Sequence, residues 1–478
     1  MTDTRISMAD PAKLDELKKA LAECENSEVL DPIKMDTIII GENALERLPE
    51  VVSRHAAGGR VLMVVDTTYI ARGNSDLKAE VGKLLGKKFE LSLVALDSSH
   101  GLHADDKASA IVEKAIAEGI DCVVGVGSGT ITDLCKNAVH ETDISIPLVI
   151  VQTALSVNAF SDGVAVMIKN GVKRTVPAKY PTALIIDLDV IKSAPADMNV
   201  AGYGDLCATW TAPADWLLAH TLSMNPKYHS APGELLTEQC RELLRRSADI
   251  KKKDPEALML LARVLTLSGL SMGIAGESTP CSGSEHLISH LIDMSADVRG
   301  KALCYHGAQV SIGSILCCIA WNRFLRDFDP KKVDIDACYP DEDEMHRRVR
   351  DAFLWLDKTG AASEECWRDY AKKLERWKEV RPEFEKFLAD WDDFKAKAEK
   401  LVVEPEYLCQ CMTEAGAPKR FRDLNPSVDR DTANWAANNS CLMRNRFVIT
   451  DLLFFLGWWD RDFVESLFRE ADGLDAGY

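Results

Sequence analysis

The chain has 478 residues, enough for two domains, and an ordinary globular composition with 46% hydrophobic and 28% charged residues. Its formal net charge of -18 repels phosphate backbones and argues against nucleic-acid binding, although one basic pocket for a small anion stays compatible with it. No uninterrupted apolar run reaches the roughly 18 residues of a membrane span, so none is expected.

The first segment, residues 1–27, is polar and charged and lacks the apolar core of a signal peptide. We therefore expect a cytoplasmic protein whose 14 cysteines are reduced. The cysteine spacing contains no pair of Cys-x-x-Cys knuckles, which argues against a structural zinc site.

From about Thr37 onward, short β-rich runs alternate with helical patterns. The predicted strands are 37–40, 61–65, 90–96, 122–126, 147–151 and 182–186, and the predicted helices are 44–54, 77–85 and 108–118. Strands that alternate with helices of this length are typical of a parallel, doubly wound, Rossmann-like sheet.

After Asp187 the pattern changes, and long helical periods dominate from Pro195 almost to the end of the chain. We therefore expect an α/β domain over about 30–190 and an all-helical domain over 191–478. Within the second domain, residues 331–403 are dense in charged side chains with tryptophans among them. This composition predicts amphipathic helices that form an insertion.

The first motif with chemistry is the glycine-rich run Gly127-Ser128-Gly129-Thr130, with Asp133 one turn later. It follows a predicted strand and opens a predicted helix, where glycines let the backbone approach a pyrophosphate near free helical amides. Such a turn is also compatible with a simple tight corner. It follows roughly the fourth strand, later than in the usual dinucleotide fingerprint.

Asp66 is the first acid at the end of a predicted strand. An acid in this position can accept hydrogen bonds from an adenosine ribose. It can equally cap a helix, so both interpretations stay open.

Three segments in the second half carry carboxylates and imidazoles. Residues 201–205 end in Asp205 and are expected to open a helix that runs toward His220. His286 and His290 lie four residues apart, on one helix face, and His306 precedes a glycine. One carboxylate with two imidazoles suits zinc, iron or nickel and leaves positions open for a substrate.

Each of these residues also has a structural explanation. Asp205 could cap a helix, the histidine pair could be buried in the core, and His306 could mark a helix end. Their joint occurrence after the glycine-rich run is what favours a metal site, where the ion could polarise a carbonyl during hydride transfer.

At this point the motifs resemble those of the sn-glycerol-1-phosphate dehydrogenases, within the superfamily of glycerol dehydrogenases, iron-type alcohol dehydrogenases and dehydroquinate synthases. The matching segments are 127–133, 153–156, 201–205 with Asp215-Trp216 and Ala219-His220, 282–290, 306–307, 415–418 and 444–453. The resemblance spans about residues 36–460 and is interrupted by the segment 331–403.

The resemblance implies a dehydroquinate synthase-like fold, with a Rossmann-like domain followed by a helical one. It implies NAD or NADP bound by the glycine-rich run together with Thr153 and Ser156. It also implies one divalent metal, zinc first with nickel or iron as alternatives, held by Asp205, His286 and His306. His290 would contact the substrate, and Asp205 and His290 would be the catalytic residues.

The activity implied is the NAD(P)-dependent interconversion of dihydroxyacetone phosphate and sn-glycerol 1-phosphate. The expected partners are a small phosphorylated substrate and further copies of the chain in a possible homo-oligomer. Lys173 and Arg174 are candidate contacts for the substrate phosphate, or else part of a solvated turn.

Asn158 departs from the family pattern, which usually places a substrate-contacting Asp at this position. An amide keeps hydrogen-bonding capacity but carries no charge. This departure keeps open another phosphorylated or phosphonylated carbonyl, or a polyol, as the substrate. Two further alternatives are a cyclase that uses the nicotinamide only transiently and a non-enzymatic scaffold that binds through the charged, Trp-containing segment.

Overall fold

The computed structural model describes residues 3–99, 101–169 and 172–478. The chain divides into two compact units that are interleaved in sequence. Unit 1 comprises Met1–Leu206 and Ala231–Glu277, and unit 2 comprises Cys207–Ser230 and Ser278–Tyr478. Unit 1 therefore extends beyond the predicted boundary near residue 190. It does so because helices after that point pack against β1 and the helices around it.

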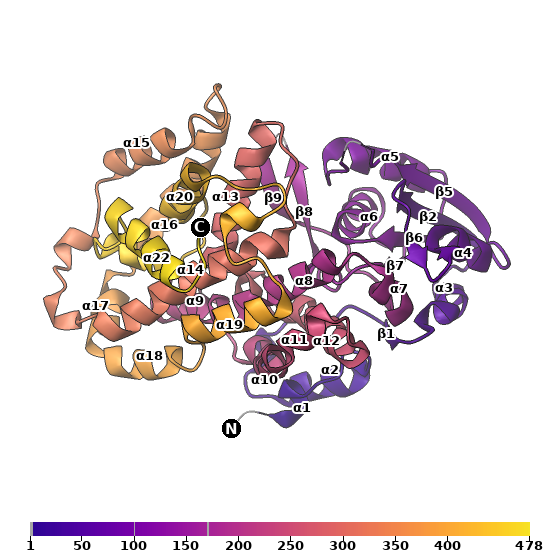
Figure 1. Cartoon of the computed structure of the whole chain (residues 1–478), viewed down its shortest axis with the longest axis horizontal. Helices are drawn as coiled ribbons and strands as arrows, with labels where there is room; N and C mark the ends of the chain where they lie inside the picture. The colour runs from indigo at the N-terminus through magenta and orange to yellow at the C-terminus, as the bar shows by residue number, and fades with distance from the viewer. Residues whose placement is uncertain (1–2, 100, 170–171) are drawn as a thin grey trace. The chain divides into compact units, whose positions relative to one another are not determined.

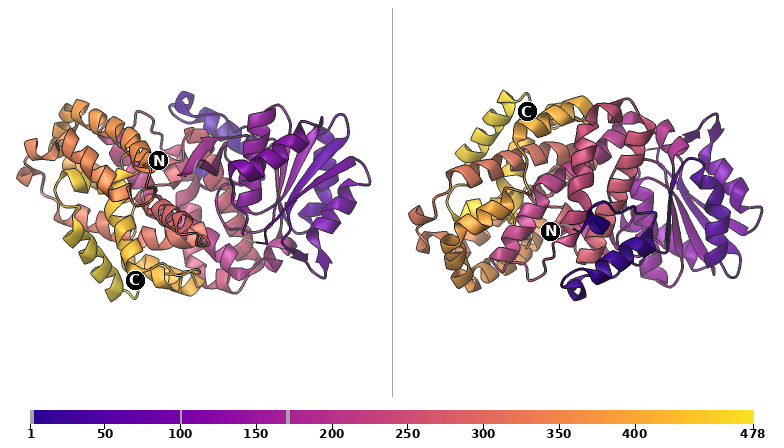
Figure 2. Two further views of the ribbon diagram at one scale, coloured as in Figure 1. Left: turned by 90° about the horizontal axis from the view of Figure 1, so that it is seen from above. Right: turned by 90° about the horizontal axis from the view of Figure 1, so that it is seen from below.

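Unit 1 is built around a parallel sheet, which has six strands among the described residues. Its order is β1 (Thr37–Gly41), β10 (Ala183–Asp187), β7 (Leu148–Gln152), β6 (Cys122–Gly127), β2 (Arg60–Asp66) and β5 (Glu90–Leu96). Each neighbouring pair of strands is parallel, as Figure 2 shows. The predicted parallel sheet is confirmed.

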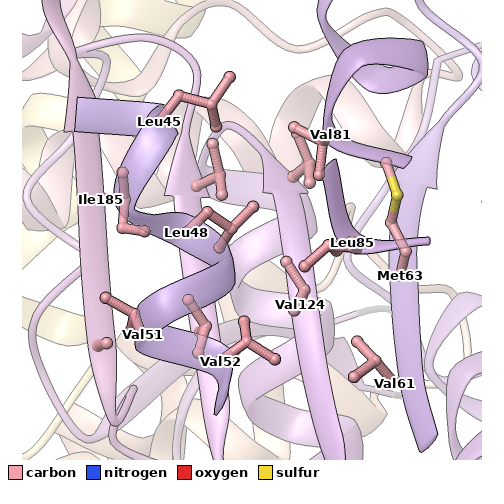
Figure 3. Close-up of a cluster of buried hydrophobic side chains, with 14 of the residues drawn as sticks. Leu45, Leu48, Val51, Val52, Val61, Met63, Val81, Leu85, Val124 and Ile185 are labelled. Carbon is pink, nitrogen blue, oxygen red and sulfur yellow. The ribbon is translucent and has the colours of Figure 1, made fainter. Parts of the chain in front are cut away.

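Helices cover both faces of this sheet, which explains why its central strands, β6 and β7, are almost entirely apolar. The helices α3 (Leu48–His55), α4 (Leu77–Leu85) and α7 (Leu188–Ser193) lie on one face, and α5 (Asp106–Ile116) and α6 (Gly129–Thr142) lie on the other (Figure 1). On the first face, Leu48 and Val52 of α3 are buried in one cluster with Val124 of β6 (Figure 3).

Unit 1 also differs from the sequence-based expectations in its local structure. The helix predicted over 44–54 is split into η2 (Ala44–Arg47) and α3, because Pro49 favours a new helix start. An antiparallel hairpin of β8 (Val164–Lys169) and β9 (Val172–Pro177) was not predicted. Lys173 and Arg174 are half-buried in β9, so their interpretation as a solvated turn is wrong.

The remaining elements of unit 1 are mostly helical. They are α1 (Thr4–Ser7), α2 (Leu14–Glu23), η1 (Ser27–Val29), β3 (Ala71–Arg72), β4 (Ser75–Asp76), α8 (Ala196–Asp205), α10 (Ala231–Arg245), α11 (Ser247–Lys251) and α12 (Pro255–Ala275).

Unit 2 is helical throughout its described elements. They are α9 (Ala212–Thr221), η4 (Thr279–Cys281), α13 (Ser284–Val298), α14 (His306–Asp327), η5 (Pro330–Lys332), η6 (Asp336–Cys338), α15 (Glu342–Phe353), α16 (Ala361–Glu379), α17 (Arg381–Ala389), α18 (Trp391–Ala398), α19 (Pro405–Ala415), η7 (Phe421–Asp423), α20 (Arg430–Asn439), η8 (Ser440–Leu442), α21 (Ile449–Phe455) and α22 (Arg461–Gly473). The short helix η3 (Leu206–Trp210) spans the boundary between the units.

The charged segment 331–403 forms α15 to α18, and its aromatic side chains are part of the core of unit 2. Trp377 is fully buried and stacks on Phe455, with ring centroids 4.8 Å apart. Trp391 is also buried and packs edge-on against Phe324 of α14. The segment is therefore packed into the helical unit and is not a solvated tail.

Two helices among the described residues, α12 and α14, are long and apolar enough to cross a membrane by length and composition alone. Most of their residues are buried inside the structure, as in the core helices of a globular protein.

Candidate metal centre and cofactor loop

The glycine-rich run forms the turn between β6 and α6. A Cβ at Gly127 would lie 2.6 Å from the Cβ of Ile131, so only glycine lets the strand meet the first turn of the helix here. Ser128 precedes the first residue of α6, and no side chain among the described residues caps that turn. Its amides can therefore serve an anionic ligand, as a pyrophosphate site requires.

The second predicted cofactor segment lies against this turn. The amide of Thr153 donates to the carbonyl oxygen of Gly127 at 3.1 Å. The hydroxyls of Ser128 and Ser156 are 2.8 Å apart. The structure thus brings these two predicted segments together, while their contact with a nicotinamide cofactor stays a prediction.

Asp133 lies one turn into α6 and is buried. Burial raises the pKa of its carboxyl group to about 7, because desolvation and the nearby Asp162 outweigh the stabilising charge of Lys136. Lys136 itself is fully buried and pairs with Asp162. The position of Asp133 supports a role beneath the loop, and a direct cofactor contact stays a prediction.

Replacing Asp133 with Asn should change how stability depends on pH. The folded protein keeps a proton on Asp133 up to about pH 7, whereas the unfolded chain releases it near the ordinary pKa of 3.8. The wild type therefore loses stability as pH rises between these values, and an Asn cannot lose a proton. The free energy of unfolding of Asp133→Asn, relative to wild type, should rise by about 1.4 kcal/mol per pH unit in this range. Urea denaturation at several pH values tests this, and a constant difference would contradict it.

Asp66, at the end of β2, is already engaged by neighbouring groups. Its carboxylate accepts from Lys78 Nζ at 2.5 Å and from the amide of Thr68 at 2.9 Å. The charge of Asp66 is thus balanced by a lysine, and the contact with a ribose stays a prediction.

Asp205 is the last residue of α8, so the expectation that residues 201–205 open a helix is wrong. The following helix, α9, begins at Ala212, and the short helix η3 lies between them. A Cβ at Gly202 would collide with the carbonyl oxygen of Leu155, so the glycine lets α8 approach the second cofactor segment. The buried carboxylate of Asp205 accepts from the amide of Asn158 at 3.0 Å. Within unit 1, Asp205 is therefore tied to the same segment as Ser156.

Three imidazoles come together in unit 2. His286 and His290 lie one turn apart on α13, and His306 is the first residue of α14. The ring centroid of His286 is 5.1 Å from that of His306 and 6.3 Å from that of His290, and the last two rings are 5.6 Å apart. His286 and His290 are buried.

The Nδ1 atoms of two of these rings are engaged by neighbours. Glu285 accepts from Nδ1 of His286 at 2.8 Å, and Ser289 Oγ lies 3.0 Å from Nδ1 of His306. Because the Ser289 hydroxyl donates to Gln309, its oxygen accepts from His306. Both rings are thereby oriented to present Nε2, as in carboxylate–histidine–metal arrangements.

Glu285 is held as an anion in a buried position. Burial raises the pKa of Glu285, but hydrogen bonds from His286, from Thr211 and from the Gly283 amide outweigh it and leave the pKa below its usual value. The orienting roles of Glu285 and Ser289 were not predicted. Glu285 directly precedes His286, and adjacent helical residues give no periodic signal of contact.

Asp205, His286 and His306 form a candidate metal-binding group. Each offers one ligand atom, and these atoms all lie within 4.8 Å of one another. A carboxylate oxygen with two oriented imidazole nitrogens fits a divalent transition metal with positions left open for a substrate. None of the fourteen cysteines, all in the described part of the chain, forms a disulfide.

The chain is similar to known alcohol and glycerol-phosphate dehydrogenases. The family described as iron-containing alcohol dehydrogenase matches residues 39–195. The chain is 30% identical over 296 residues to a glycerol-1-phosphate dehydrogenase of Bacillus subtilis that uses NAD(P). The aligned residues are 62% of this chain and 74% of the relative. It is 32% identical over 297 residues to the enzyme of the same name from Pyrococcus horikoshii. The aligned residues are 61% of this chain and 80% of that relative.

Two solved structures show the same fold. A probable glycerol dehydrogenase from Sinorhizobium meliloti matches with a TM-score of 0.57 and 17% identity, over 92% of this chain and 98% of that one. A maleylacetate reductase from a Rhizobium species matches with a TM-score of 0.53 and 16% identity, over 92% and 98% of the two chains. The predicted architecture, a parallel α/β domain with a helical region, is confirmed.

Proposed function

Because the chain belongs to the glycerol-1-phosphate dehydrogenase family, we propose that it interconverts dihydroxyacetone phosphate and sn-glycerol 1-phosphate. It is an NAD(P)-dependent, metal-dependent oxidoreductase. The observation that carries the proposal is the grouping of one carboxylate and two imidazoles at Asp205, His286 and His306. Fourteen cysteines without a disulfide support a cytoplasmic location, where thiols stay reduced.

The proposed metal ligands are Asp205, His286 and His306. A bound divalent ion, zinc first with nickel or iron as alternatives, would supply Lewis acidity to the carbonyl oxygen of the substrate. The chain's contribution is orientation: the amide of Asn158 fixes the Asp205 carboxylate, and Glu285 fixes the ring of His286.

The cofactor is assigned to the turn at the start of α6. Backbone amides at Ser128 and Gly129 would bind the pyrophosphate, and the hydroxyls of Thr153 and Ser156 would line the same site. His290, one turn beyond His286, would hydrogen-bond the substrate and donate a proton to the oxygen that gains charge during hydride transfer.

The proposal is tested with a substrate panel. The metal-loaded protein is given phosphorylated ketones and aldehydes and an unphosphorylated polyol, with NADH, NADPH and their oxidised forms. We expect dihydroxyacetone phosphate to consume reduced cofactor in proportion to product. A product formed without net change in the cofactor would instead support a cyclase, and no turnover with any compound would contradict the dehydrogenase proposal.

One observation favours keeping a second substrate under consideration. The side-chain amide of Asn158 donates to Ser268 Oγ at 3.0 Å, and its backbone amide donates to Asp205. Asn158 therefore lies directly beside a proposed metal ligand without carrying a charge. Another phosphorylated or phosphonylated carbonyl could suit this neutral position.

Asn158→Asp measures the importance of that missing charge. If the native substrate is not dihydroxyacetone phosphate, the variant should raise the kcat/KM ratio for dihydroxyacetone phosphate over the native substrate by about 10-fold or more. Ser268→Ala is the matched control, because it removes the partner of Asn158 without adding a charge. If wild type reduces dihydroxyacetone phosphate efficiently and Asn158→Asp is no better, Asn158 does not indicate a different substrate.

A further inference from the structure

A buried lysine in the charged segment links that segment to the C-terminal part of unit 2. Lys373 of α16 is 1% exposed, in a segment where most lysines are solvated. Its ammonium group donates to Asp451 Oδ1 at 2.6 Å and to the carbonyl oxygens of Cys441 at 2.5 Å and Arg446 at 3.2 Å. These three acceptors use all three of its donors, which compensates for the burial of the charge.

Arg446 provides the first connection from Lys373 toward the histidines. The carbonyl oxygen of Arg446 accepts from Lys373. The guanidinium group of Arg446 donates to the carbonyl oxygen and the hydroxyl of Ser282, and also to the hydroxyl of Ser278. The hydroxyls of Ser282 and Ser278 accept at 2.8 Å and 2.6 Å. Ser282 lies two residues before α13 begins at Ser284. The connection therefore fixes the segment that leads into the helix of His286.

Asp451 provides the second connection. Its other oxygen, Oδ2, accepts from the amide of Val448 at 3.0 Å, which fixes the start of α21. The next amide, of Ile449, donates to Asp215 Oδ1 at 2.9 Å. Asp215 Oδ2 in turn accepts from the amide of Ser284 at 2.8 Å and from its hydroxyl at 2.6 Å. This path is buried and ends two residues before His286.

We infer that Lys373 is a positioning residue for His286, acting through Arg446 and through Asp451 with Asp215. The segment 331–403 is then a support for the metal centre. This inference rests on the proposed function, because it requires His286 to be a ligand. Replacing a residue that orients a metal ligand without touching the metal typically lowers metal affinity by about 10–100-fold. Because Lys373 acts through intervening groups, we expect an effect of about 10-fold.

The first test compares Lys373→Met with Lys372→Met, which changes the exposed neighbour on the same helix. The affinity of the metal-free proteins for Zn²⁺ is measured by competition with a chelating dye, at a temperature where circular dichroism shows both to be folded. Lys373→Met should bind Zn²⁺ about 10-fold more weakly, and Lys372→Met should match wild type. The absorption bands of the Co²⁺-loaded protein should shift only in Lys373→Met. Equal Zn²⁺ affinity in all three proteins would overturn the inference.

A second variant separates positioning from stability. Lys373→Met leaves the carboxylate of Asp451 buried without its partner and should lower the melting temperature. Lys373→Met with Asp451→Leu removes both charges, so the melting temperature should recover. The double variant lacks both the bond from Lys373 to Arg446 and the bond from Val448 to Asp451, so Zn²⁺ affinity should stay low. If affinity recovers together with stability, Lys373 is only structural and the inference is wrong. If wild type binds no divalent metal at all, the proposed function itself fails.

Discussion

Replacing His286 or His306 with Ala is expected to abolish stoichiometric metal binding and to lower kcat/KM by about 10³-fold or more, while the protein stays folded. Both imidazoles belong to the group whose ligand atoms lie within 4.8 Å of one another. A Lewis acid at a reacting carbonyl supplies several kcal/mol of transition-state stabilisation, and each 1.36 kcal/mol is about tenfold in rate. Metal per chain is measured by mass spectrometry and folding by circular dichroism.

The matched control for these variants is His220→Ala. His220 is exposed at the end of α9, and its ring stacks on Tyr228 at 5.1 Å. This variant should keep both metal and activity. Full metal occupancy in both His286→Ala and His306→Ala would show that the metal is bound elsewhere and would contradict the assignment.

His290→Ala should lower kcat/KM by about 10²–10⁴-fold while metal content and cofactor affinity stay at wild-type values. Its ring lies 6.3 Å from that of His286 and 5.6 Å from that of His306, close enough for contact with a substrate bound at the proposed metal site. General acid catalysis by a positioned imidazole has this magnitude.

His290→Gln refines the experiment, because an amide can hydrogen-bond a substrate but cannot transfer a proton. If His290 donates a proton, the Gln variant should recover KM but not kcat. A loss of metal in His290→Ala would instead make His290 a ligand, and the assignment among the three histidines would be wrong.

Much of the α/β fold could be predicted from hydrophobic periodicity. The helix over 77–85 and the strand over 90–96 match α4 and β5 at both ends. The β8–β9 hairpin was missed because Lys173 and Arg174 interrupt the apolar pattern of β9. The prediction that residues 201–205 open a helix was wrong, because it took Gly202 as a sign of a helix start. Gly202 is needed inside α8, where the helix approaches the backbone of Leu155, and no local pattern shows this long-range contact.

The candidate site was predictable only in part, for a similar reason. The spacing of His286 and His290 places them on one helix face, so their proximity follows from the sequence. The partner of Glu285 at Thr211 is 74 residues away in the chain, and no spacing rule connects them. The residues around Lys373 in the sequence are mostly charged, as on a solvated helix face. Only the burial of Lys373 in the structure distinguishes it from the exposed Lys372.

The proposed function is tested most directly by the configuration of the product. Metal-loaded protein is incubated with dihydroxyacetone phosphate and NADH or NADPH, and the glycerol phosphate formed is assayed with an enzyme specific for the sn-3 enantiomer. We predict that the product is sn-glycerol 1-phosphate, that a chelator stops its formation and that added Zn²⁺ or Ni²⁺ restores it. Formation of sn-glycerol 3-phosphate, or the same rate without any metal, would contradict the proposal.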